Sequence, residues 1–213
     1  MEKANFILGK LSELFPTANV SLNFSSDFTC LVAVVLSAQC TDAVVNSVVE
    51  KLFKVAATPA EFIALGEQKL KEIIRPCGFS NTKARHILGT AKIILEKHSG
   101  HVPETFGELE ALPGVGHKTA SVVMSQCFGK AAFPVDTHIA RLANRWGLEK
   151  SRNVKKIEMT LKKLFPESTW QTLHLQLISY GRKFCPARGH TIEKCPICLE
   201  FSCTVDKWAF QSA

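Results

Sequence analysis

The apolar residues recur at helical spacing along nearly the whole chain, and no stretch shows the strict alternation of a half-buried strand. Glycines and prolines interrupt this pattern at short intervals, so the connections between helices are short. There is no internal repeat, no low-complexity segment and no long Pro/Ser linker. The pattern predicts about ten helices and an all-α fold.

Residue types that begin and end helices stand where the apolar pattern changes. Residues 25–27 (Ser-Ser-Asp) precede the apolar run 28–38 and offer N-cap oxygens. Residues 58–61 (Thr-Pro-Ala-Glu) combine a cap, a proline at the first helical position and a capping-box glutamate. Asn81 precedes another helical stretch. Helix ends are predicted at three glycines: Gly78, Gly100 and Gly129.

A chain of 213 residues has room for one large domain or two small ones, and its formal net charge of +7 suits a polyanionic partner. Nucleic acid and an anionic membrane surface both fit that charge. The longest apolar run, residues 28–38, is too short to cross a bilayer, and the N-terminus has no signal-peptide core. We therefore expect a cytoplasmic protein with no membrane partner.

The eight cysteines form two groups. One group is scattered singly among apolar residues and is predicted to act as small buried hydrophobes: Cys30, Cys40, Cys77 and Cys127. In a reducing cytosol no disulfide is expected among the eight. The other group forms the pattern Cys185-x9-Cys195-x2-Cys198-x4-Cys203. Four thiolates this close in sequence fit either a tetrahedral zinc site or a four-iron cluster, and the spacing does not choose between them.

The segment 112–120 (LPGVGHKTA) contains a glycine turn between two helical stretches. Gly114 and Gly116 permit backbone angles that side chains forbid, and the amides that open the next helix can point at a phosphate. A plain corner between helices is the alternative. Lys118 follows in the first turn, where the helix dipole disfavours an ammonium and so favours a neutral, nucleophilic amine. A lysine that grips phosphate by its charge alone explains the position equally well.

An aspartate follows 18 residues after this lysine, in the segment 135–139 (VDTHI). Asp136 stands directly before a helical stretch, so it can be an ordinary N-cap. A carboxylate fixed in direction by helix-end amides can also stabilise positive charge on a sugar or handle a proton.

Taken together, LPGVGHKTA, VDTHIARLANRWGL, LSAQCTD (residues 36–42) and the C-terminal cysteines resemble the endonuclease III family. The resemblance runs from about residue 4 to 205. It implies an all-α, two-lobed helix-hairpin-helix DNA glycosylase fold with a C-terminal iron–sulfur cluster loop. Residues 22–132 would form a six-helix domain, and residues 1–21 with 133–213 a cluster domain.

The resemblance also implies a chemistry for the two candidate catalytic residues. Lys118 would attack C1′ of the damaged nucleotide and form a Schiff base, and Asp136 would be the catalytic carboxylate. The implied activity is removal of oxidised pyrimidines from double-stranded DNA, followed by β-elimination 3′ to the abasic site. A single monomer suffices for this reaction.

In the family, a glutamine and an apolar residue enter the duplex where the damaged nucleotide leaves it. Gln39 and Phe79 match these positions, although leucine is common at the second. A helix-end hydrogen bonder and a buried loop anchor are the respective alternatives. His138 can equally be an interior histidine, and Asp42 a helix cap. The remaining residues that the resemblance assigns to DNA binding are Asp42, Asn81, Lys83, Gly114, Gly116, His117 and His138.

The resemblance further implies a [4Fe–4S] cluster on Cys185, Cys195, Cys198 and Cys203. The first loop between these cysteines is longer, and the last shorter, than is usual in the family. The longer loop contains Arg188, His190 and Lys194. We expect Arg188 and Lys194 to contact the DNA backbone, with an exposed basic loop as the alternative.

Two other functions compete with this interpretation. An adenine-removing relative of the family is monofunctional, lacks the lysine and usually has an additional C-terminal domain. A non-enzymatic module that only binds DNA would need the hairpin and the cluster but no nucleophile.

Overall fold

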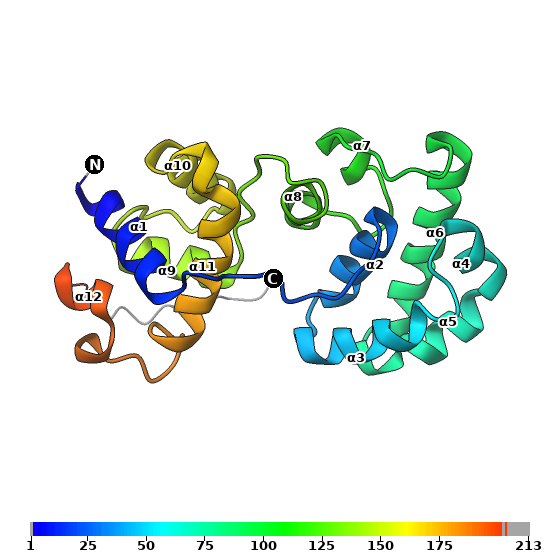
Figure 1. Ribbon diagram of the computed structural model, residues 1–213, viewed down its shortest axis with the longest axis horizontal. Coiled ribbons are helices and arrows are strands. Elements are labelled where there is room, and N and C mark those ends of the chain that lie inside the picture. The colour runs from blue at the N-terminus through cyan, green and yellow to red at the C-terminus, as the bar shows by residue number, and fades with distance from the viewer. Residues whose placement is uncertain (1, 202, 204–213) are drawn as a thin grey trace. The chain divides into compact units, whose positions relative to one another are not determined.

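The computed structural model describes residues 2–201 and 203, and every regular element within this part of the chain is a helix, as the sequence predicts. The chain divides into two compact units, shown together in Figure 1. We call Ser21–Lys130 the hairpin unit, and Met1–Val20 with Ala131–Ala213 the cysteine unit. Residues 204–213, which the sequence assigns to the cluster domain, lie outside the described residues.

The hairpin unit is built around one buried helix. Its elements are α2 (Asp27–Ser37), α3 (Asp42–Leu52), α4 (Pro59–Leu65), α5 (Glu67–Ile74), the 3-10 turn η1 (Arg75–Cys77), α6 (Ser80–His98), α7 (Phe106–Glu110) and α8 (His117–Gln126). Every residue of α2 from Phe28 to Leu36 is buried. This helix packs against α3, α6 and α8, which explains why its sequence is apolar on all sides (Figure 1).

The cysteine unit combines the N-terminal helix with the second half of the chain. Its elements are α1 (Glu2–Leu14), α9 (Thr137–Arg145), α10 (Val154–Leu164), the 3-10 turn η2 (Glu167–Thr169), α11 (Trp170–Lys183), the 3-10 turn η3 (Ile192–Lys194) and α12 (Pro196–Glu200). Helix α11 packs against both α1 and α9 (Figure 1). The rings of Trp146 and Tyr180 meet edge to face at 5.5 Å in the core of this unit.

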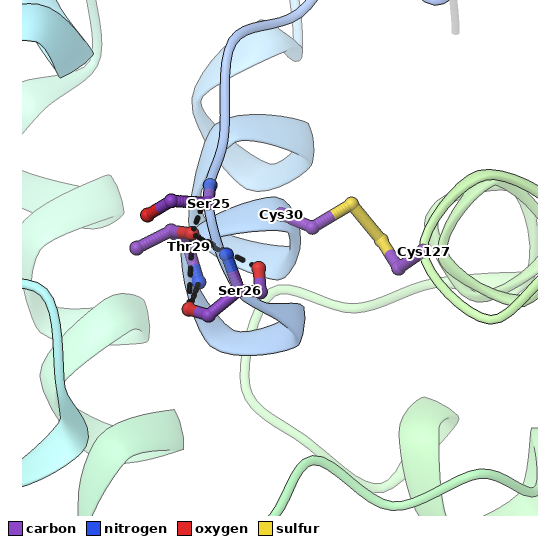
Figure 2. Close-up of a disulfide and its surroundings, with 5 residues drawn as sticks. All are labelled: Ser25, Ser26, Thr29, Cys30 and Cys127. Carbon is purple, nitrogen blue, oxygen red and sulfur yellow. Dashed lines mark hydrogen bonds between the residues drawn. A yellow bond between two sulfur atoms is a disulfide. The ribbon is translucent and has the colours of Figure 1, made fainter.

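The predicted helix caps form. Ser26 Oγ accepts a hydrogen bond from the backbone N–H of Thr29 at 3.2 Å, and Thr29 Oγ1 accepts one from Ser26 at 2.8 Å (Figure 2). Thr58 and Glu61 exchange the same pair of bonds at the start of α4. Gly78, Gly100 and Gly129 all have positive φ at helix ends, as predicted.

The start of α6 differs from the prediction. The helix begins at Ser80 rather than after Asn81, and Phe79 occupies the N-cap position with φ of 49°. A left-handed phenylalanine is unusual because its Cβ clashes with the backbone, so local sequence rules do not predict a helix start there.

The expectation that no disulfide forms is wrong: Cys30 of α2 is bonded to Cys127 at the C-terminal end of α8 (Figure 2). Cys30 and Cys77 are buried as predicted, whereas Cys127 and Cys40 are only half-buried. The two bonded cysteines are 97 residues apart in sequence, and the packing of α2 on α8 brings their Cα atoms to 6.1 Å. Spacing along the chain contains no sign of such a contact.

No helix among the described residues is both long and apolar enough to cross a bilayer.

The disulfide closes a long loop within the hairpin unit, so it removes conformational entropy from the unfolded chain. We expect reduction of this bond to lower the free energy of unfolding by about 2–4 kcal/mol. The check is thermal unfolding with and without dithiothreitol. The Cys127→Ser variant should unfold, with or without dithiothreitol, at the temperature of the reduced wild type. If the unfolding temperature of the wild type does not change with dithiothreitol, the disulfide does not contribute to stability.

Candidate functional site

The turn between α7 and α8 is anchored by two apolar side chains. Leu112 and Val115 are 3% and 4% exposed, and the N–H of Val115 donates to Leu112 O at 3.1 Å. Gly114 and Gly116 lie on the exposed side of the turn. The hairpin therefore presents peptide backbone, rather than side chains, at the surface.

The two glycines have different surroundings. Gly114 has φ of 77°, and a Cβ there would lie 2.7 Å from His86 Nδ1, so a side chain is excluded. Gly116 has an ordinary extended backbone, and a Cβ there would meet no atom within 4 Å. Its missing side chain leaves open space directly in front of the first amides of α8, and these amides have no acceptor within the helix.

Helix α6 supports the hairpin from behind. Thr90 Oγ1 donates to Pro113 O at 3.1 Å, and a Cβ added at Gly89 would lie 3.2 Å from the Pro113 ring. With the contact between His86 and Gly114, two consecutive turns of α6 fix the position of this loop. The sequence analysis did not identify His86; its helical spacing from Thr90 is the only signal that could have indicated it.

Lys118 and His117 open α8 and have different surroundings. Lys118 is exposed, and within the described hairpin unit its ammonium has no hydrogen-bond or ion-pair partner. His117 is half-buried, with Nδ1 2.7 Å from Glu110 Oε1 and its ring stacked on Phe106 at 5.6 Å. The lysine is thus available for a ligand, whereas the histidine braces α8 against α7.

A pocket of about 200 Å³ lies beside the hairpin, lined by Val35, Ala38, Gln39, Phe79, Thr82, Lys83, His86 and Gly114. Gln39 and Phe79 are exposed, and Phe79 is 65% accessible, which is rare for so large an apolar side chain. Both have positive φ, of 53° and 49°. The exposure of the Phe79 side chain excludes the alternative that it is a buried loop anchor.

The structure does not support Lys83 as a direct DNA contact. Its side chain is buried, and Nζ donates to Leu36 O and Ala38 O at 2.8 Å and to Cys77 O at 2.9 Å. An ammonium has three N–H groups, and all three are used. Burial lowers the pKa of Lys83, while the nearby thiols of Cys77 and Cys40 oppose that shift.

Asp42 and Asn81 lie at the starts of two helices in the hairpin unit. Asp42 is in the first turn of α3, where its Oδ2 accepts from Ser21 Oγ at 2.9 Å, and the N-cap is Thr41. Asn81 is exposed in the first turn of α6.

In the cysteine unit, Asp136 caps α9. Its Oδ1 accepts a hydrogen bond from the N–H of Ile139 at 2.8 Å, which fixes the direction of the half-exposed carboxylate. Two residues after Asp136, His138 Nδ1 lies 3.1 Å from Arg141 Nη2. Arg141 is buried and also donates to Cys185 O at 3.1 Å.

Three of the four clustered cysteines gather around one point. The donor atoms of Cys185, Cys195, Cys198 and His190 all lie within 4.8 Å of one another. The three sulfurs are fully buried. Thiolates so close repel one another, so a bound cation is needed to ionise them together. Three soft thiol donors and an imidazole fit a zinc ion or an iron–sulfur cluster.

The remaining predicted ligand, Cys203, is outside this group of four donors. It is 7% exposed, and its backbone N–H donates to Cys198 O at 3.0 Å. Burial raises the pKa of its thiol.

Two residues that the sequence analysis missed bind these sulfurs. Arg145 is buried, and its Nη1 lies 3.3 Å from Cys185 Sγ and 2.7 Å from Pro186 O. The Tyr180 hydroxyl accepts from the N–H of Ile197 at 3.0 Å and lies 3.2 Å from Cys195 Sγ. A guanidinium and a hydroxyl directed at sulfur stabilise negative charge there. The sequence did contain one signal for Arg145. Two arginines, Arg141 and Arg145, stand four residues apart among apolar residues, so they lie on the same side of one helix.

Arg188 and Lys194, in the loop between the first two clustered cysteines, are exposed. Their side chains are therefore accessible to a ligand.

The chain matches known proteins over most of its length. The model of the family described as HhH-GPD superfamily base excision DNA repair protein matches residues 32–167. Endonuclease III of Escherichia coli (strain K12) is 45% identical over 191 residues, covering 90% of each chain. Endonuclease III of Bacillus subtilis (strain 168) is 39% identical over 198 residues, covering 92% of this chain and 90% of the relative.

Solved structures give the same result. A trapped covalent intermediate of endonuclease III with DNA matches with a TM-score of 0.89 at 39% identity, covering 94% of both chains. A non-covalent endonuclease III–DNA complex matches with a TM-score of 0.90 at 39% identity, covering 95% of this chain and 94% of that one. The chain therefore belongs to the HhH-GPD superfamily of base excision DNA repair proteins and, within it, to the endonuclease III family of DNA glycosylases.

Proposed function

We propose that this protein removes oxidised pyrimidines from double-stranded DNA and then cleaves the strand 3′ to the abasic site, acting as a monomer. The observation that supports this most directly is Lys118. It is an exposed amine in the first turn of α8, behind a turn that presents only backbone, and it has no partner within the described hairpin unit. A relative in the same family has been trapped as a covalent intermediate with DNA.

The proposed reaction begins at the sugar. The neutral amine of Lys118 bonds to C1′ and passes a proton to Asp136, while the bond from C1′ to the base breaks and the base leaves with the electron pair, taking up a proton from water. The sugar ring then opens, O4′ takes up the proton from Asp136, and an iminium forms between Lys118 and C1′. This cation acidifies the C2′ proton, whose loss expels the 3′-phosphate and breaks the strand. Water hydrolyses the remaining Schiff base and regenerates the lysine.

Asp136 stabilises the positive charge that develops on the sugar and accepts the proton that the attacking amine loses. Its hydrogen bond to the N–H of Ile139 keeps the carboxylate in one direction before substrate binds. The proposal requires Lys118 and Asp136 to reach the same nucleotide.

Gln39 and Phe79 are the proposed residues that fill the space left by the flipped nucleotide. Both side chains are exposed and line one pocket, and both residues have a left-handed backbone conformation. An exposed aromatic ring can stack between bases at small cost, because the duplex has already been unstacked there.

The other proposed DNA contacts have smaller roles. The amides after Gly114 and Gly116 bind a phosphate, as helix N-termini do. His117, which is held against α7, keeps those amides in place. The remaining proposed contacts are Asp42, Asn81, His138, Arg188 and Lys194, of which Arg188 and Lys194 are exposed cations suited to the DNA backbone.

We also propose that the clustered cysteines, Cys185, Cys195, Cys198 and Cys203, belong to a [4Fe–4S] site. The buried thiols and the guanidinium of Arg145 suit a group that carries negative charge. When bound, this group supplies a structural tie between α9, α11 and α12, and the proposed reaction needs no electron transfer.

Borohydride trapping tests the nucleophile. Wild-type protein should be captured covalently on DNA that contains an abasic site, because borohydride reduces the iminium to a stable amine. Lys118→Gln should give no captured complex, and Lys54→Gln, a substitution at an exposed lysine just after α3, should give the wild-type amount. Capture by Lys118→Gln at the wild-type level, or its absence from the wild type, would refute the Schiff-base mechanism.

Asp136→Asn separates capping from catalysis. Asparagine caps helices as well as aspartate, so the thermal stability should stay within about 0.5 kcal/mol of wild type. The rate of base removal from a duplex with one oxidised pyrimidine should fall by about 10²–10⁴-fold, because the charge is lost. Single-turnover kinetics measure the rate, and thermal unfolding measures the stability. If the rate of base removal does not change, Asp136 only caps α9 and has no role in catalysis.

A further inference from the structure

His190 has an environment that the proposed four-cysteine site does not explain. Its two ring nitrogens are buried, and neither has a hydrogen-bond partner in bonding geometry within the described residues. Burying a polar atom without a hydrogen-bond partner destabilises the folded state. The imidazole therefore needs a partner of another kind at this position.

The ring is directed toward the sulfurs. One of its nitrogens lies within 4.8 Å of the sulfurs of Cys185, Cys195 and Cys198. Cys203 is near Cys198 but is not one of the four mutually close donors.

We propose that His190, in place of Cys203, completes the set of metal ligands with Cys185, Cys195 and Cys198, and that Cys203 stays beside the site as a spare donor. A neutral imidazole nitrogen is a common metal ligand, and coordination would satisfy one of the buried ring atoms. The longer loop between Cys185 and Cys195 is what brings His190 into the site. The ligand assignment holds for an iron–sulfur cluster and for a single zinc ion, so it is tested separately from the proposed cofactor.

The first measurement is the iron, sulfide and zinc content of the protein as isolated. Iron together with sulfide supports the [4Fe–4S] proposal. Zinc alone contradicts that proposal, but the assignment of His190 as a ligand is then still tested by the zinc experiment below. In the iron case, pulsed EPR of the reduced protein with ¹⁵N-labelled histidine should show a directly bonded nitrogen that is lost in His190→Ala. In the zinc case, cobalt(II) substitution should give an absorption spectrum of three thiolates and one nitrogen, which changes in the same variant.

Metal content of variants provides the second test. Cys203→Ser and His190→Ala should each keep the metal, because one donor replaces the other. The double variant should lose at least about tenfold in metal occupancy, as Cys198→Ser should alone. Absence of a histidine nitrogen signal in wild type, or loss of metal from Cys203→Ser as complete as from Cys198→Ser, would overturn the proposal.

A different observation supports a second inference, which rests on the proposed function. The three carbonyls bound by Lys83 belong to two separate segments, the C-terminal ends of α2 and of η1. Leu36 and Ala38 precede Gln39 at the end of α2, and Cys77 precedes Phe79 by two residues at the end of η1. The negative ends of both helical segments face the ammonium, so backbone dipoles balance its buried charge.

We infer that Lys83 is a positioning residue for the pair that enters the duplex. Gln39 and Phe79 both have left-handed backbones, which persist only where the surroundings enforce them. By bonding Ala38, which directly precedes Gln39, and Cys77, two residues before Phe79, Lys83 fixes the distance between the two segments. It does so without contacting DNA, since its three N–H groups are already occupied.

Comparison of two substrates tests this role. Lys83→Met keeps the length of the side chain but removes its charge and donors. Base removal from a duplex should fall about 10- to 100-fold, since the paired residues lose their fixed spacing. Lyase activity on single-stranded DNA with an abasic site should stay within about twofold of wild type, because no base has to be displaced from a stack.

Two further variants control for folding. Lys92→Met, at an exposed lysine of the same helix, should match wild type on both substrates. Lys83→Arg retains a charge and several donors and should recover part of the duplex activity. Equal loss on both substrates by Lys83→Met would indicate only a damaged fold, and no loss on either would remove Lys83 from the mechanism. Wild type that fails to cleave the abasic strand would instead contradict the proposed function.

Discussion

One face of α6 fixes the loops around the pocket in the hairpin unit. Lys83, His86 and Thr90 follow one another at helical spacing, so their side chains lie on one side of a 19-residue helix. Lys83 bonds the loops before Gln39 and Phe79, His86 lies against Gly114, and Thr90 holds the Pro113 carbonyl. Because a helix is stiff, these contacts convert three separate loops into one surface. The spacing between the proposed base-filling residues and the proposed nucleophile depends on this face.

The local parts of this arrangement can be predicted from sequence because local physics determines them. The caps at Ser26 and Thr58 depend on residues three positions away, and the ends at Gly78 and Gly100 depend on one residue each. The glycine turn and the group of clustered cysteines are equally local. Each of these patterns has a physical meaning before the chain is folded, and the structure contains the helices and the turn that they predict.

What the sequence could not predict depends on contacts between distant segments. The bond between Cys30 and Cys127 requires α2 to pack on α8, and nothing in their 97-residue separation indicates it. A lysine is normally read as a surface residue, so Lys83 was assigned to DNA rather than to three buried carbonyls. The position of His190 among the sulfurs depends on the path of a loop, and loop paths follow from packing rather than from residue type.

In the cysteine unit, α9 connects the proposed catalytic carboxylate to the clustered sulfurs that are proposed to hold the metal. Asp136 caps its first turn, and Arg145, in its last turn, donates to the sulfur of Cys185. Arg141 lies between them and binds the Cys185 carbonyl. A metal held by Cys185 would therefore fix the C-terminal half of a short helix, and the direction of the Asp136 carboxylate would follow from the position of the N-terminal end of that helix. A metal centre that takes no part in the chemistry can thus still be required for catalysis, because it would hold a catalytic group in position.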